Sequence, residues 1–267
     1  ESFNDKRIQY ISHSQNKKLA AARNTGIRSA RGKYIAYLDD DDVFLPKHLE
    51  TLVNFLENNS EYKVAYTDAF RSHQNKVNDS YVTFKKDIPY SQDFDSIEIL
   101  FGNYIPVICI VHHKQILNEV GLFDETLTTH EDWDLWIRIS RKYPFHHIKQ
   151  VTCEFSWRED GSTMTSSIRE DFYRTRSIIY LKNKPLFQQE IERAIADGNL
   201  ELAERIVAKL LNIFDPKYHP EPLIDLGVIR SLQSRYDEAI QIFQKVLELH
   251  PGNEIAYENL KILSEKV

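Results

Sequence analysis

The order of helix-like and strand-like segments in the first part of the chain constrains the fold most. Residues 7–12 alternate as a short strand does, and residues 17–30 carry small and apolar residues at helical spacing. The continuous apolar run at 34–38 predicts a strand covered on both faces. Apolar residues then recur with helical period after Pro46, and residues 63–69 predict another strand. Alternating helices and strands are typical of an α/β sheet with crossover connections.

The following segments extend this pattern with less regular structure. Residues 70–95 are polar and rich in turn formers, which predicts a loop or a loose hairpin. An apolar segment then leads into a short helix that we expect Gly121 to end. A longer helix is expected over 131–142, and an edge strand over 146–157. The α/β region should therefore end shortly after this strand.

The last third of the sequence predicts helices without strands, which divides the chain into 1–168 and 169–267. This part contains two segments that can be aligned with each other, ADGNLELAERIVAKLLNIFDP and SLQSRYDEAIQIFQKVLELHP. The second resembles a tetratricopeptide repeat, whose consensus offsets it fills with Leu226, Gly227, Tyr236, Ala239, Phe243 and Pro251. The first is more divergent, and two generic amphipathic helices are the alternative for it.

The small residues of the second segment suggest how its helices pack. We expect Gly227 and Ala239 to let two helices approach each other, and Phe243 to fill the space between hairpins. A further helix over 254–265 should cap the stack.

Composition excludes several classes of protein. The net charge of -6 argues against the basic surface of a nucleic-acid-binding protein. The two cysteines, Cys109 and Cys153, have neither the spacing of a zinc site nor the number of a disulfide framework. Neither a membrane span nor a signal peptide is expected from the sequence, so we expect a cytoplasmic protein that reaches a membrane only peripherally, through partners.

Four aspartates, Asp39 to Asp42, follow the apolar run directly. At the C-terminal end of a strand they would face the crevice where α/β proteins bind ligands. Alternation along an extended chain would direct Asp39 and Asp41 to one side, and two carboxylates there suit Mg²⁺ or Mn²⁺. The alternative, strongest for Asp42, is a helix cap or a solvated turn. An EF-hand loop or an aspartyl phosphatase fits less well, because the remaining residues of those motifs are missing.

A second acidic group lies in TTHEDWDLWIRIS, residues 128–140. Thr129 and Asp132 have the spacing of a capping box, and acidic residues in a first helical turn favour the helix dipole. The same carboxylates also lie beside Trp133 and Trp136, and apolar surroundings can bring the pKa of a general base toward neutral.

A third group, Arg23 and Asn24, lies on the helix that precedes the apolar run. A cation there could meet a diphosphate, and an ordinary surface charge is the alternative.

Taken in order, AAARNTGIRSARGKYIAYLDDDDVFLPKHLE and EVGLFDETLTTHEDWDLWIRIS resemble the family 2 glycosyltransferases over about residues 8–165. That family has a GT-A fold, a Rossmann-like α/β sheet, with a DxD motif and a later ED pair. The resemblance implies a partial GT-A domain followed by the helical tail. It lacks the family's opening strand–helix–strand segment, which holds the nucleoside. We expect the chain to be a fragment of a larger enzyme rather than a remnant that has lost nucleotide binding.

The resemblance also implies roles for individual residues. Contacts to the nucleotide or its diphosphate are implied for Asp39, Arg23, Asn24 and Arg158, and metal binding for Asp41 together with Asp39. Asp132 would be the catalytic base, with Glu131 and Trp133 on the acceptor side.

The activity implied is a metal-dependent, inverting transfer from a nucleotide-sugar, expected to be UDP-linked, with Mn²⁺ or Mg²⁺ as cofactor. Glycan, lipid and protein acceptors all remain open. The alternative is a non-catalytic scaffold that binds a protein partner through the helical repeats.

Overall fold

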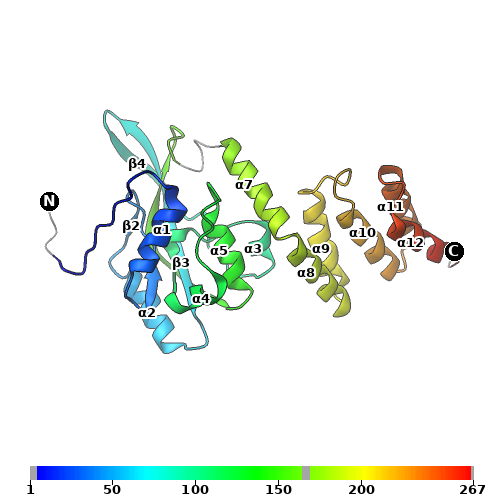
Figure 1. Ribbon diagram of the computed structural model, residues 1–267, viewed down its shortest axis with the longest axis horizontal. Coiled ribbons are helices and arrows are strands. Elements are labelled where there is room, and N and C mark those ends of the chain that lie inside the picture. The colour runs from blue at the N-terminus through cyan, green and yellow to red at the C-terminus, as the bar shows by residue number, and fades with distance from the viewer. Residues whose placement is uncertain (1–4, 164–168, 266–267) are drawn as a thin grey trace. The chain divides into compact units, whose positions relative to one another are not determined.

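The computed structural model describes residues 5–163 and 169–265. Contacts between residues divide the chain into two compact units, Glu1–Leu181 and Lys182–Val267. The first unit contains a curled mixed sheet with helices, and the second contains helices alone among the described residues (Figure 1). The α/β class expected from the sequence is therefore confirmed. The domain boundary expected between 168 and 169 stays a prediction, since helix α7 lies between it and the division by contacts.

Among its described residues, the first unit contains six strands and several helices in mixed order. The strands are β1 (Tyr34–Ala36), β2 (Val43–Phe44), β3 (Val64–Val77), β4 (Ser80–Asp87), β5 (Ile110–His113) and β6 (Phe145–Arg158). The helices are α1 (Lys18–Ser29), α2 (His48–Asn58), α3 (Glu98–Phe101), α4 (Leu117–Val120), α5 (Glu131–Ser140) and α7 (Arg169–Lys182), with short 3₁₀ turns at Val107–Cys109 and Lys114–Ile116.

The sheet has the strand order β1-β5-β3-β6-β2, with β4 paired to β3. The β3–β6 pair is parallel, whereas β5 pairs antiparallel with both β1 and β3. β2 pairs antiparallel with β6, so the aspartates between β1 and β2 connect strands at the two ends of this order. The C-terminal end of β6 thereby reaches the same aspartates.

Helices cover both faces of the sheet. Val111 of β5 packs with Leu52 and Leu56 of α2 in one buried cluster. The next residue, His112, points to the other face because side chains alternate along a strand. There its ring lies 6.5 Å from that of Trp136 of α5, and its Nε2 is 2.7 Å from the Tyr37 hydroxyl. Buried side chains therefore lie on both faces of the sheet. Helix α5, which carries the second acidic group, covers the face opposite α2.

Three sequence expectations about strands were wrong. Residues 7–12 form no strand, and Tyr10 is 92% exposed, because this segment pairs with no described strand. The run at 34–38 is covered on one face only, since Ile35 and Tyr37 are buried whereas Leu38 is 54% exposed. The strand expected at the sheet edge is β6, which pairs on both sides, with β3 and with β2.

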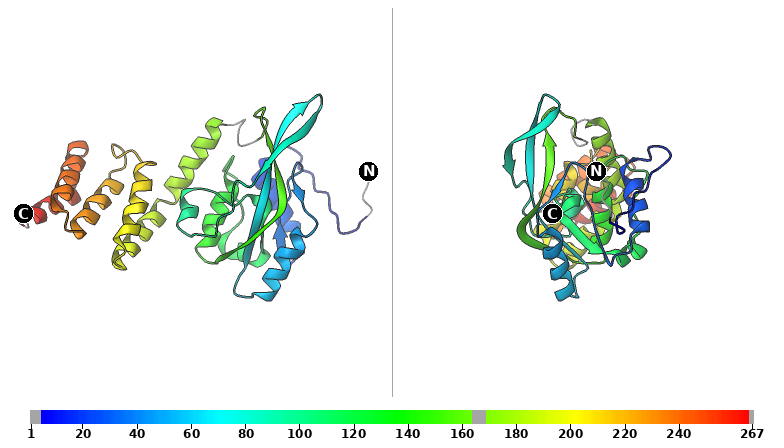
Figure 2. Two further views of the ribbon diagram at one scale, coloured as in Figure 1. Left: turned by 180° about the vertical axis from the view of Figure 1, so that it is seen from behind. Right: turned by 90° about the vertical axis from the view of Figure 1, so that its left-hand side faces the viewer.

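The polar segment 70–95 contains a hairpin in its first part. β3 continues through it to Val77 and turns into β4, and this hairpin extends beyond the other strands (Figure 2). The sequence predicted either a hairpin or a loop here. Residues 70–87 form the hairpin, and the rest of the segment forms a loop. Gly121 ends α4 as expected, with a φ of 82° that favours glycine.

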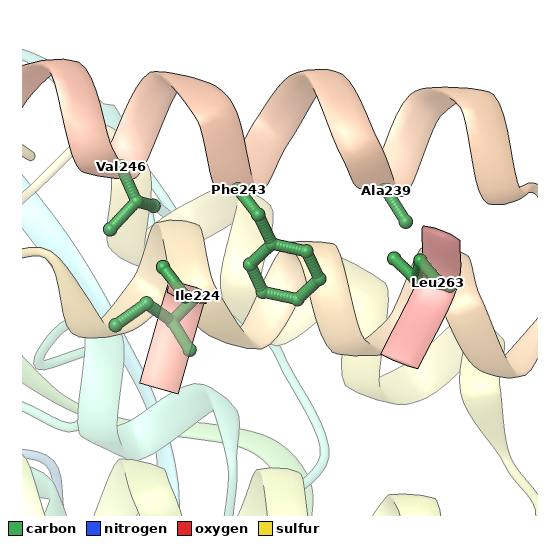
Figure 3. Close-up of a cluster of buried hydrophobic side chains, with 6 residues drawn as sticks. Ile224, Ala239, Phe243, Val246 and Leu263 are labelled. Carbon is green, nitrogen blue, oxygen red and sulfur yellow. The ribbon is translucent and has the colours of Figure 1, made fainter. Parts of the chain in front are cut away.

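The second unit consists of the helices α8 (Lys184–Ala196), α9 (Leu200–Leu211), α10 (Glu221–Leu232), α11 (Tyr236–Leu249) and α12 (Glu254–Ser264). Ala239, Phe243 and Val246 of α11 pack against Ile224 and Leu263 in a buried cluster (Figure 3). A Cβ at Gly227 would lie 2.7 Å from Cζ of Phe243, so the close approach expected at this glycine is confirmed.

Replacing Gly227 by valine is expected to lower the free energy of unfolding of this unit by about 2 kcal/mol, because the new side chain overlaps the Phe243 ring. Gly252 has open space around its Cα, so Gly252→Val serves as a control with a change within about 0.5 kcal/mol. Urea unfolding followed by circular dichroism measures both. Equal stability of the two variants would contradict the packing described.

Candidate active site

A cavity of about 1040 Å³ opens where the aspartates, the start of α5 and the end of β6 meet. Segments far apart in the sequence line it, including 38–42, 129–133 and 155–158, with Asn103 and two residues of α7. Of the predicted site residues, seven line this cavity: Arg23, Asp39, Asp41, Glu131, Asp132, Trp133 and Arg158. The two acidic groups that the sequence analysis treated separately therefore belong to one site.

The four aspartates form a turn rather than an extended strand. The Asp42 amide donates to the Asp39 carbonyl oxygen over 3.2 Å, and all four residues line the cavity. The expected sorting of side chains to two sides by strand alternation is therefore wrong. Asp42 accepts from the Ser156 amide over 3.1 Å, which ties the turn to β6. Burial raises the pKa of Asp42 to about 7, and the charges of Asp41 and Asp39 add to this shift.

Arg23 joins the two acidic groups. Its Nη1 lies 2.6 Å from Oε1 of Glu131, and its Nη2 donates to both carboxylate oxygens of Asp39 over 3.0 and 2.9 Å. The side chain is 8% exposed, so the alternative of an ordinary surface charge is wrong. Its Nε is buried without a hydrogen-bond partner among the described residues. Arg23 thus holds Asp39 and Glu131 on opposite sides of one guanidinium.

Asn24 does not line the cavity and has a structural role. Its Nδ2 donates to the Phe123 carbonyl oxygen over 2.9 Å and to Glu125 over 2.8 Å. Its Oδ1 accepts from the Phe123 amide over 3.0 Å. Because its amide group is fully engaged in this contact between α1 and the 123–125 loop, the geometry does not support the predicted nucleotide contact.

Asp132 is held by two hydrogen bonds. Its Oδ1 accepts from the Trp133 amide over 2.8 Å, and its Oδ2 accepts from Nδ2 of Asn103 over 2.9 Å. Asn103 is itself fixed, since its Oδ1 accepts from the Ile105 amide over 3.0 Å. Sequence reasoning missed Asn103, because no spacing connects it to Asp132. Burial raises the pKa of Asp132, and Arg23 opposes that shift.

Glu131 also has a raised pKa, of about 7. Burial is the main cause, the neighbouring Asp132 carboxylate adds to it, and Arg23 opposes it. Two adjacent buried carboxyls titrate as a pair. The site therefore contains two neighbouring carboxyls whose pKa values are both raised, and a pKa near the working pH suits a general acid or base.

The start of α5 differs from a capping box. His130 precedes the helix with a left-handed φ of 59°, and no side chain caps the helix there. Thr129 bonds instead to Nδ1 of His130 over 2.9 Å. Trp133 is 1% exposed and its Nε1 donates to the Ile99 carbonyl oxygen, so its ring belongs to the core rather than to an exposed acceptor surface.

Arg158 lies on the other side of the aspartate turn. Its Nη2 is 3.0 Å from Oδ2 of Asp41, and its guanidinium lies 4.5 Å from the Tyr81 ring centroid. The Tyr81 hydroxyl donates to Asp160 over 2.8 Å and so fastens the chain after β6 to the β3–β4 hairpin. Arg158 itself is the last residue of β6.

Helix α7, which belongs to the predicted helical tail, contributes two residues to the cavity. Phe172 and Arg176 line the cavity. The Phe172 ring lies 4.1 Å from that of His130, and Tyr180 lies 5.5 Å from Trp133. These contacts join α7 to the start of α5.

The charges around the cavity favour a cation. Six carboxylates line it among the described residues, against the three guanidinium groups of Arg23, Arg158 and Arg176. No group of three or more histidine, cysteine, aspartate or glutamate residues in the described chain is arranged to hold a metal. Asp39 and Asp41, the predicted metal ligands, both line the cavity, and each is paired with an arginine, Asp39 with Arg23 and Asp41 with Arg158.

Comparison with known proteins identifies the first part of the chain. Residues 1–116 match the model of the family described as glycosyl transferase family 2. They carry a glycosyl transferase family 2 domain. The resemblance seen in the sequence is confirmed to this extent, and strands β1 to β5 lie within the matched residues whereas β6 follows them.

Several similar proteins are named as glycosyltransferases. An uncharacterized glycosyltransferase of Methanocaldococcus jannaschii is 32% identical over 186 residues, which cover 68% of this chain and 62% of the relative. One of Bacillus subtilis is 29% identical over 147 residues, covering 55% and 52%. One of Rickettsia bellii is 32% identical over 167 residues, covering 60% of this chain and 22% of the relative. The chain thus spans less than two thirds of the length of each of these relatives.

In the described part of the chain, no helix is both long enough and apolar enough to cross a membrane.

Proposed function

We propose that the cavity is the active site of an inverting glycosyltransferase that moves a hexose from a nucleotide-sugar to an acceptor hydroxyl. The observation that carries the proposal is that Asp132 and the aspartate turn line one cavity, in which Arg23 pairs with both Asp39 and Glu131, the residue before Asp132. A base and a diphosphate site must flank the same anomeric carbon for a direct displacement, and this arrangement supports such a pair of sites.

In the proposed reaction Asp132 removes the proton of the acceptor hydroxyl as its oxygen attacks the anomeric carbon. Asn103 holds the carboxylate in one orientation during this step. Arg158 and Arg23 stabilise the negative charge that develops on the departing nucleoside diphosphate. We propose Mn²⁺ or Mg²⁺ at Asp41 and Asp39, where it would offset the surplus of carboxylates and bind the diphosphate. The donor proposed is UDP-linked.

The test is transfer or slow donor hydrolysis by the protein with a panel of nucleotide-sugars and Mn²⁺. Activity should be lost on chelation with EDTA and restored by Mn²⁺ or Mg²⁺. Asp41→Ala should lose at least about tenfold in affinity for UDP in the presence of Mn²⁺, because a carboxylate ligand is removed. Activity that survives both chelation and Asp41→Ala would refute the metal site while leaving the transfer itself standing.

The raised pKa of the carboxyl pair predicts the pH dependence of the reaction. Asp132 must be ionised to act as base, so in the wild type kcat/KM should fall as pH decreases through the pKa of Asp132, which burial raises above its ordinary value. Glu131→Gln removes a neighbouring negative charge and leaves more of the Arg23 charge to Asp132, which lowers the pKa of Asp132. The acidic limb of the profile should therefore move to lower pH. A profile measured between about pH 5 and 9 that stays in place, or moves to higher pH, would contradict this assignment.

For the second unit we propose a tetratricopeptide-like fold that binds a protein partner. The packing of Phe243 against Gly227 and Ala239 supports the fold, and stacked helical pairs commonly present binding surfaces. A cytoplasmic location is also proposed, and the two free thiols of Cys109 and Cys153, whose Sγ atoms lie 3.7 Å apart, support it.

A further inference from the structure

Arg176 differs from the other two arginines of the cavity. Arg23 is paired with Asp39 and Glu131, and Arg158 is paired with Asp41. Arg176 is exposed and has no carboxylate partner among the described residues. Its Nε donates to the Tyr180 hydroxyl over 2.9 Å, and its guanidinium lies 5.4 Å from the Tyr180 ring centroid. Among the described residues that line the cavity, Arg176 is therefore the arginine without a carboxylate partner, and its remaining donors are available to a ligand.

The position of Arg176 is fixed by contacts of α7 with the first unit. Tyr180, which holds the guanidinium, donates its hydroxyl to the Phe101 carbonyl oxygen over 2.8 Å. Thr175, the residue before Arg176, lies within 3.3 Å of the Thr128 hydroxyl. A guanidinium held in this way loses less conformational freedom on binding than one at the end of a free side chain.

These contacts place Arg176 beside the start of α5. The charge of Arg176 is close enough to His130 to lower the pKa of that imidazole, to about 4, in addition to the larger effect of burial. His130 directly precedes Glu131 and Asp132. In a direct displacement the attacking hydroxyl and the leaving diphosphate lie on opposite sides of the anomeric carbon. A cation beside the base therefore faces the acceptor, while the cation at Asp41 faces the diphosphate.

We propose that Arg176 binds an anionic group of the acceptor, a phosphate or a carboxylate, and that the acceptor is consequently an acidic sugar or sugar conjugate. This inference rests on the proposed function, since it takes Asp132 as the base. Six carboxylates around the cavity would otherwise repel such an acceptor. The planar guanidinium can donate two parallel hydrogen bonds to either group.

The experiment measures binding of three small acceptor probes by NMR titration, in the presence of UDP and Mn²⁺. The probes are methyl glucoside, methyl glucoside 6-phosphate and methyl glucuronide. They are titrated into the wild type, Arg176→Gln, Arg176→Lys and Arg174→Gln. Arg174 lies on the same helix, pairs with Asp171 over 2.7 Å and does not line the cavity, so it is a matched control.

The wild type and Arg174→Gln should bind one acidic probe about 10- to 100-fold more tightly than the neutral probe. Whether the phosphate or the carboxylate is favoured identifies the anion. Arg176→Gln should lose this preference, Arg176→Lys should keep part of it, and the affinity for UDP should stay the same in all four proteins.

Equal affinity of the wild type for all three probes would overturn the inference. So would a loss of UDP affinity in Arg176→Gln with unchanged probe binding, which would assign the arginine to the donor. If UDP binds to none of the proteins while the preference for an acidic probe depends on Arg176, the anion site stands and the proposed donor is wrong.

Discussion

Replacing Asp132 by asparagine is expected to lower kcat by about 10²- to 10⁴-fold, the range that a general base supplies. Asparagine keeps the shape of the side chain and can still accept from the Trp133 amide, so the start of α5 should remain folded. The affinity for UDP should change little, because Asp132 faces the acceptor in the proposed reaction. Initial rates with the best donor and acceptor, together with UDP titrations, measure both quantities.

The control for this variant is Asp79→Asn, in the exposed turn between β3 and β4. It should retain wild-type kcat. Unchanged turnover in Asp132→Asn, with wild-type circular dichroism, would remove Asp132 from the role of base. A loss of UDP affinity as large as the loss of kcat would instead assign Asp132 to donor binding.

Replacing Arg23 by methionine is expected to lower the free energy of unfolding of the first unit by about 3–5 kcal/mol at pH 7. The substitution leaves the carboxylates of Asp39 and Glu131 without their shared partner, and Glu131 is 6% exposed. Urea unfolding followed by tryptophan fluorescence reports on this unit, because all three tryptophans, Trp133, Trp136 and Trp157, lie in it. Arg28→Met on the same helix is the control, since Arg28 is 59% exposed and should contribute little.

The loss of unfolding free energy in Arg23→Met should be larger at neutral pH than in acid. Without Arg23 the pKa of Glu131 rises further above its unfolded value, so the folded state binds more protons than the unfolded state. Stability then falls as pH rises from the unfolded pKa through the folded one, and the variant should approach the wild type in acid. Glu131→Gln combined with Arg23→Met should recover part of the loss. A destabilisation that is the same at every pH and unaffected by Glu131→Gln would contradict the buried ion pair.

Elements with strong periodicity could be predicted from the sequence. The helices at 17–30, after Pro46 and at 131–142 appear as α1, α2 and α5, because each buries one apolar face. Residues 7–12 alternate correctly yet form no strand, since a strand also needs a partner that the pattern does not reveal. The full length of β3 was missed for a related reason: its second half is polar and is paired mainly through the backbone with β4 and β6.

The candidate site could be predicted only in part. Asp39, Asp132 and Arg23 were chosen from motifs, and the cavity brings all three together. Asn103 and Arg176 could not be chosen, because their relation to Asp132 and to the start of α5 exists only in the folded chain. Asn24 stands in the same motif as Arg23, but neighbouring positions on a helix point in different directions, and Asn24 contacts the 123–125 loop instead.

The central claim is a one-step displacement between a base at Asp132 and a diphosphate at the aspartate turn. The anomeric configuration of the first product, determined by ¹H NMR during transfer from an α-linked nucleotide-sugar, tests it most directly. A single displacement predicts a β-linked product, because the hydroxyl attacks opposite the leaving group. An α-linked first product would contradict the assignment of Asp132 as the base of a direct displacement.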